Sequence, residues 1–98
     1  MDMQTLARQI EVAGRSSPAY FDTVLRIRLR DLLVDKVSLE TGTERESVRR
    51  TLVDERQGQR MLRDFALYKL LYYPPPRTAE ARLRMLRETI DRIETWKA

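Results

Sequence analysis

Apolar residues are densest between Pro18 and Thr41, where they are too numerous to form a single narrow stripe. A helix that is apolar around most of its circumference must be covered on several sides by its neighbours. The pattern therefore predicts a long central helix over about residues 18–41, with the rest of the chain packed around it. Its apolar residues are Tyr20, Phe21, Val24, Leu25, Ile27, Leu29, Leu32, Leu33, Val34, Val37 and Leu39.

One part of this stretch also fits a strand. Residues 24–30 place Ile27 and Leu29 between three arginines, which is the alternation of a half-buried strand. The alternation stops at Asp31, and no partner strand with a turn signal follows it. Because neither Gly nor Pro occurs between residues 19 and 41, we expect one helix rather than two that are separated by a break near Asp31.

The ends of the central helix carry capping signals. Ser17 can cap its N-terminus with Pro18 at the first helical position, and Gly42 can end it in the left-handed conformation. Before it, residues 2–13 predict a short amphipathic helix that ends at Gly14. The apolar side of that first helix would consist of Met3, Leu6, Ala7 and Ile10.

A shorter helix is predicted directly after the central one. Thr43 and Glu46 have the spacing of a capping box, in which the Thr43 hydroxyl accepts a hydrogen bond from the Glu46 amide. The helix that follows carries Val48, Leu52 and Val53 as its apolar positions. We therefore expect a capped, amphipathic third helix of the bundle.

The next stretch predicts a break, another helix and a linker. Residues 54–60 contain no apolar side chain, and Gly58 among them marks the expected break. Apolar periodicity resumes at Met61 and stops at two tyrosines and three prolines, residues 72–76. This run can be a stiff linker or a ligand for a proline-recognising domain, and the absence of P-x-x-P spacing favours the linker.

The last helix is predicted over residues 79–97, with Thr78 as its N-cap. Its apolar residues alternate at spacings of three and four, as in a coiled-coil seam. Since this stripe is narrower than most globular helices bury, it favours self-association or a partner helix over core packing within one chain. The candidate interface residues are Leu83, Leu86, Ile90, Ile93 and Trp96.

Composition is consistent with one all-α domain over residues 1–98, built from four or five helices. Of the 98 residues, 42% are hydrophobic and 35% charged, which is a globular balance. No run approaches membrane-spanning length, and cysteine is absent, so we expect a soluble cytoplasmic protein without disulfides. The net charge of +4 lies after residue 42 and is interleaved with carboxylates, which gives nucleic-acid binding only faint support.

The residue inventory argues against an enzyme. Without His or Cys, the common nucleophile–base pairs and zinc sites are excluded. The three glycines are isolated, so no loop can cradle a phosphate group. Asp31 and Asp35 lie one helical turn apart and Asp54 adjoins Glu55, but such pairs are common on solvated helix faces. We therefore expect no catalytic activity, no cofactor, no metal and no small-molecule substrate.

One segment points to a specific activity. Residues 42–52, with Gly42 in the turn and Val48 buried, resemble the turn and recognition helix of helix-turn-helix DNA-binding domains, particularly winged-helix transcription regulators. The resemblance covers residues 34–52 and implies a short helix before the turn, in which Ser38 packs against the recognition helix. The residues that it implies as DNA contacts are Arg45, Ser47, Arg49 and Arg50.

These observations leave two functions open. The first is a small non-enzymatic binding or assembly protein that acts through protein–protein contacts and self-associates through residues 79–97. The second is a helix-turn-helix regulator that binds double-stranded DNA, in which the same C-terminal helix dimerises. The two functions differ in one structural requirement. The DNA-binding geometry needs a break in the helix near Asp31, and an unbroken helix over residues 18–41 would rule that geometry out.

Overall fold

Helices are the only regular elements in the part of the chain that the computed structural model describes, residues 4, 5, 8 and 17–98. This confirms the predicted all-α class. The apolar positions of the helix expected over residues 2–13 lie outside the described residues.

The central helix is continuous from Pro18 to Thr41. It consists of α2 (Pro18–Tyr20), the π-helical turn η1 (Phe21–Leu25) and α3 (Arg26–Thr41). As predicted, the Ser17 hydroxyl accepts a hydrogen bond from the Tyr20 amide at 3.2 Å, and Gly42 ends α3 with a φ of 71°. No break occurs at Asp31, and the strand alternative for residues 24–30 is wrong.

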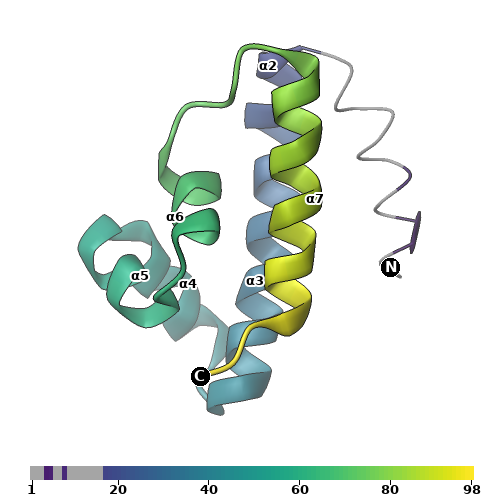
Figure 1. Cartoon of the computed structure of the whole chain (residues 1–98). Coiled ribbons are helices and arrows are strands. Elements are labelled where there is room, and N and C mark those ends of the chain that lie inside the picture. The colour runs from purple at the N-terminus through teal and green to yellow at the C-terminus, as the bar shows by residue number, and fades with distance from the viewer. Residues whose placement is uncertain (1–3, 6–7, 9–16) are drawn as a thin grey trace.

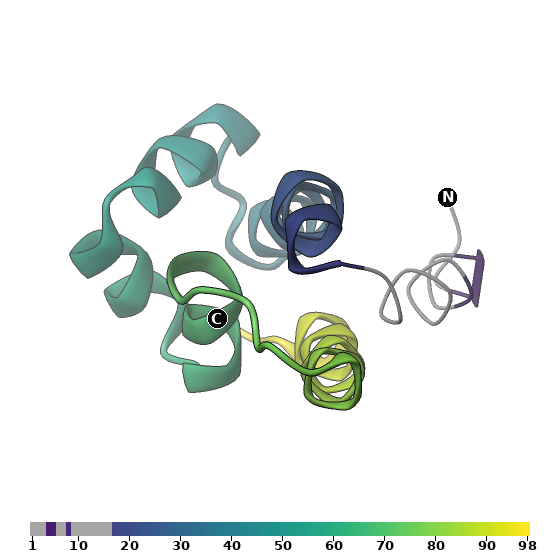
Figure 2. The ribbon, with the colours of Figure 1, turned by 90° about the horizontal axis from the view of Figure 1, so that it is seen from above.

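α3 and α7 (Ala79–Thr95) lie side by side and run in the same direction (Figure 1). The view along these two helices shows that α4 (Arg45–Val53), α5 (Glu55–Leu62) and α6 (Phe65–Tyr72) all lie on one side of the pair (Figure 2). The opposite side is therefore covered by none of the helices labelled in Figure 1.

The breaks between α4, α5 and α6 are at two aspartates, so the break expected at Gly58 is wrong. The Asp54 carboxylate accepts a hydrogen bond from the Gln57 amide at 2.9 Å and caps α5, and Asp64 caps α6 through the Leu67 amide at 3.1 Å. A carboxylate at the N-cap satisfies an otherwise unpaired amide, which favours starting a new helix there. Gly58 instead lies buried within α5.

The predicted capping box is also wrong. The N-cap residue of α4 is Glu44, and its side chain makes no capping hydrogen bond. Thr43 belongs to the turn instead, where its amide donates to the Thr41 hydroxyl at 3.2 Å and its carbonyl accepts from the Ser38 hydroxyl at 2.7 Å. These bonds fix the turn after Gly42, so that α4 begins at Arg45.

The proline segment between α6 and α7 is held at its carbonyl groups by two arginines. Arg26 of α3 donates to the carbonyls of Leu70 and Tyr73 at 2.8 and 2.7 Å. The buried Arg82 of α7 donates to the carbonyls of Pro76 and Arg77 at 3.0 and 2.8 Å. Charged donors strengthen such bonds. The segment therefore has the geometry of the stiff linker that the sequence favours.

Candidate interaction surfaces

Two of the four residues implied as DNA contacts are ion-paired across the turn with the preceding helix. Arg45 contacts Asp35 at 2.8 Å, and Arg49 contacts Asp31 at 3.8 Å and Glu46 at 2.8 Å. Ser47 is half-buried and Arg50 is exposed. Since phosphate binding depends on uncompensated positive charge, these pairs weaken the electrostatic case for DNA on this helix.

The helix before the turn is longer than the resemblance implies. α3 passes Asp31 without a break, so the two short helices that the DNA-binding geometry needs before the turn are one helix here. The likeness of residues 34–52 to helix-turn-helix domains stays a prediction.

The apolar seam of α7 is divided between the core and the surface. Leu86, Ile93 and Trp96 are at most 6% exposed, and the Trp96 indole N–H donates to the Leu62 carbonyl at 3.0 Å. Most of the surface of these three side chains is therefore unavailable to a second copy, although Ile93 also lines a groove between α3 and α7. Leu83 and Ile90 are half-buried and are the members of the predicted interface that remain accessible. Self-association itself stays a prediction.

A shallow apolar hollow of about 440 Å³ lies between α3 and α7, and we call it the α3–α7 groove. Its lining residues are Leu32, Asp35, Lys36, Leu39, Ile93 and Glu94. The Leu39 side chain is 82% exposed and Glu94 is also exposed, whereas the other four lining residues are at least partly covered. Ile90 lies one helical turn before Glu94, and Leu83 two turns before Ile90, so both continue the α7 wall of the groove. The accessible part of the predicted seam thus continues towards the exposed Leu39 and the half-buried Leu32 of α3.

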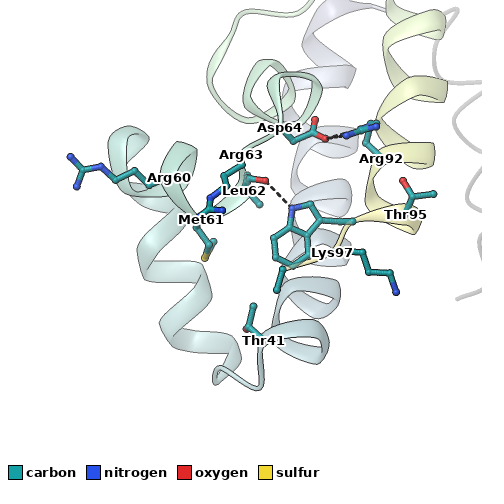
Figure 3. Close-up of a pocket in the computed structure, with 11 residues that line it drawn as sticks. Thr41, Arg60, Met61, Leu62, Arg63, Asp64, Arg92, Thr95 and Lys97 are labelled. Atoms are coloured by element: carbon teal, nitrogen blue, oxygen red, sulfur yellow. Dashed lines mark hydrogen bonds and ion pairs between the residues drawn. The ribbon is translucent and has the colours of Figure 1, made fainter.

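A larger cavity of about 540 Å³ lies beside Trp96, at the C-terminal end of α7 (Figure 3). The side-chain carboxylate that lines this cavity belongs to Asp64. Its Oδ2 atom accepts from Nε and Nη2 of Arg92 at 2.6 and 2.5 Å, while its Oδ1 atom caps α6. Hydrogen bonding to Asp64 raises the pKa of Arg92 above its already high usual value. The ion pair is therefore a structural link between α6 and α7, and both carboxylate oxygens of Asp64 accept hydrogen bonds within the chain.

Four aromatic side chains form a cluster on α6, and two of them are open to solvent. Phe65 is 62% and Tyr73 is 44% exposed. Tyr72 is anchored by donating its hydroxyl to the Leu52 carbonyl at 2.7 Å, and Tyr68 donates to the carboxylate of Glu55. That hydrogen bond is the main reason why the pKa of Tyr68 rises to about 12. Helical spacing could have indicated this cluster, but the sequence interpretation treated these tyrosines only as the end of an apolar face.

Among the described residues, no group of three or more acidic side chains is placed to hold a metal ion, and no helix is both long and apolar enough to cross a membrane. Comparison of the chain with family models, curated proteins and solved structures finds no match.

Proposed function

We propose that this protein is a small helical binding protein that acts through protein–protein contacts and associates with a second copy of itself through the α3–α7 groove. The observation that carries the proposal is the exposure of Leu39, which lines the groove between α3 and α7 together with Leu32. Complete burial of a leucine side chain stabilises an association by about 1.5–3 kcal/mol.

The charges around the groove suit a contact between identical surfaces. A two-fold interface brings the same patch of each subunit together, so that the patch must be complementary to itself. The groove carries Lys36 together with Asp35 and Glu94. Lys36 lies 3.4 Å from Glu40 of its own chain, and Asp35 pairs with Arg45. The group that a second copy, turned by the two-fold axis, can bring to this lysine is therefore its exposed Glu94.

Double-stranded DNA is the weaker candidate partner. Of the residues implied as DNA contacts, Arg45 and Arg49 pair with carboxylates of this chain. A DNA phosphate would have to compete with Asp35 and Asp31 for these guanidinium groups, which lowers the gain from binding.

Sedimentation of the wild type and two variants over a range of protein concentrations tests the proposal. Leu39→Asp places a carboxylate in the groove, and Val53→Asp is a matched control because Val53 is 80% exposed, on α4. We expect a wild-type dimer, a Leu39→Asp monomer and a Val53→Asp dimer. A wild-type monomer at all concentrations, or equal dissociation of both variants, contradicts self-association through the groove.

A further inference from the structure

The outer face of α5 carries arginines that have no partner in the described part of the chain. Arg56 and Arg60 lie four residues apart on one face of α5, Arg63 is the C-cap residue that directly follows this helix, and all three are exposed. No ion pair or hydrogen bond from these side chains to another described residue is present. Figure 3 shows the Arg60 side chain pointing away from Asp64. We call these three residues the α5 stripe.

The α5 stripe differs in this respect from arginines elsewhere in the fold. Five other arginines contact carboxylates or backbone carbonyls of the chain itself. They are Arg26, Arg45, Arg49, Arg82 and Arg92. Other exposed arginines without a described partner, such as Arg50 on α4 and Arg84 on α7, occur singly, whereas α5 and its C-cap residue together carry three.

The α5 stripe ends at a small hollow next to the aromatic cluster. Gln59, Arg63, Asp64, Phe65 and Tyr68 enclose about 150 Å³ there, and we call this space the aromatic hollow. A protein cavity of about 150 Å³ is large enough to take a benzene molecule. The aromatic hollow can thus accept one apolar or aromatic side chain of a partner, at the end of a row of three guanidinium groups.

The backbone at Arg63 also makes this position unusual. Arg63 ends α5 in the left-handed conformation, with φ 52° and ψ 39°, where glycine or asparagine is favoured. A side chain at this position costs stability relative to glycine. Arg63 therefore belongs both to the α5 stripe and to the lining of the aromatic hollow.

The packing of the aromatic rings favours a protein partner over a nucleic acid. Phe65 stacks on Tyr68 with 6.1 Å between ring centroids, meets the edge of Tyr73 at the same distance and has the Lys69 ammonium 5.1 Å from its centroid. Sequence-tolerant nucleic-acid binding requires open ring faces on which bases stack. Here Phe65 stacks on Tyr68, and Tyr73 meets both of these rings in edge contacts, so that the cluster presents an apolar surface with a hollow instead.

We propose that the α5 stripe and the aromatic hollow form a docking site for an acidic segment of a partner protein. Carboxylates of the segment pair with Arg56, Arg60 and Arg63, and one apolar or aromatic side chain enters the aromatic hollow. The site is separate from the α3–α7 groove, so it holds whether or not the protein self-associates. Bidentate pairing of its carboxylates with the arginines orients the acidic segment on the site.

The spacing of the α5 stripe restricts the segment further. With a rise of 1.5 Å per residue, the seven-residue interval from Arg56 to Arg63 spans about 10 Å along the helix. In an extended peptide, alternate residues lie on the same side and about 6–7 Å apart. The partner segment is therefore an extended one with acidic residues at alternate positions, followed by the apolar residue.

Fluorescence anisotropy with labelled probes tests the site. The probe is a synthetic peptide with glutamates at three alternate positions followed by a phenylalanine, and a peptide with glutamines in their place is its uncharged counterpart. Arg60→Gln/Arg63→Gln removes two charges of the α5 stripe, and Arg50→Gln/Arg77→Gln removes two exposed charges elsewhere. We expect the first variant to bind the glutamate peptide about tenfold more weakly than the wild type. The control variant and the wild type should differ by less than about threefold.

Three results would overturn the proposal. They are absence of binding to the wild type, equal weakening in both double variants, and stronger Arg63-dependent binding of a labelled single-stranded oligonucleotide than of the peptide. Circular dichroism of each variant shows whether it is folded. Arg63→Gly provides a second check that a folding defect cannot imitate, since it should raise the melting temperature while it weakens peptide binding.

Discussion

The Tyr72 hydroxyl occupies the space that a side chain at Gly58 would need: a Cβ there would lie 1.9 Å from the hydroxyl oxygen. The same hydroxyl donates to the Leu52 carbonyl at 2.7 Å, which links α6 to the end of α4. Gly58 is buried inside α5, so its lack of a side chain allows α6 to pack directly on this helix.

Replacement of Gly58 by alanine is predicted to destabilise the protein. Alanine normally stabilises a helix interior by about 1 kcal/mol relative to glycine. Here the overlap with Tyr72 should outweigh that gain, with a net loss of about 1–3 kcal/mol in the free energy of unfolding. Urea denaturation measures the change. The Gly58→Ala substitution should cost less in a Tyr72→Phe background, and an equal cost in both backgrounds would show that the hydroxyl contact is not the cause.

Arg63→Gly is predicted to stabilise the protein by about 1 kcal/mol, because glycine adopts the left-handed conformation of residue 63 without strain. The matched control is Arg60→Gly, in which the same exchange within α5 should destabilise the protein by about 1 kcal/mol. Both changes remove one exposed arginine of the α5 stripe. Thermal denaturation measures both, and a change of the same sign in the two variants would contradict the backbone explanation.

The helix boundaries show which features the sequence could indicate. Ser17, Gly42 and Thr78 act through hydrogen bonds or conformations within a few residues, and their capping roles were predicted correctly. Gly58 was interpreted wrongly as a break, because its role depends on Tyr72 in a different helix. Local sequence shows that glycine disfavours a helix, but it does not show that a distant hydroxyl fills the vacant space.

The candidate surfaces were predictable only in part. The spacing of Leu83 and Ile90 indicated an apolar stripe, but how much of that stripe the chain itself covers depends on where α3 and α6 pack. The pairing of Arg45 with Asp35 likewise depends on how α4 lies against α3. The break at Asp64 and the left-handed Arg63 place the α5 stripe next to Phe65, and neither follows from the periodicity of the sequence.

Tyr68 is predicted to ionise near pH 12. The pKa of its hydroxyl is raised from 10 to about 12, first by the hydrogen bond to Glu55. An acid with a higher pKa in the folded chain than in the unfolded chain stabilises the fold while it is protonated. The contribution of Tyr68 is therefore fully present below pH 10 and is lost as the pH rises towards 12.

Tyrosinate absorbance during an alkaline titration measures this ionisation. In a Glu55→Gln variant the latest-ionising tyrosine should shift to lower pH, and in Tyr68→Phe its step should disappear. Tyr72 also has a raised pKa, mainly because of burial, so the Tyr68→Phe variant is needed to assign the step. An unchanged titration in both variants would contradict the assignment.

Substitutions in the α7 seam should separate core positions from surface positions. Leu86 is fully buried, so Leu86→Asp should unfold the monomer, because a buried carboxylate without a partner costs several kcal/mol. Leu83 is half-buried, and Leu83→Asp should lower the free energy of unfolding by less than about 1.5 kcal/mol. Circular dichroism with urea denaturation checks both. Equal destabilisation by the two substitutions would show that Leu83 also belongs to the core.

The most direct test of self-association through the α3–α7 groove is a dilution series followed by amide chemical shifts in NMR spectra. The account predicts that the shifts that change with protein concentration cluster at Leu32, Leu39, Leu83 and Ile90. It also predicts that amides of α5 keep their shifts, since the α5 stripe is on the other side of the molecule. Shifts that do not depend on concentration, or changes that cluster on α5 and α6 instead, would contradict it.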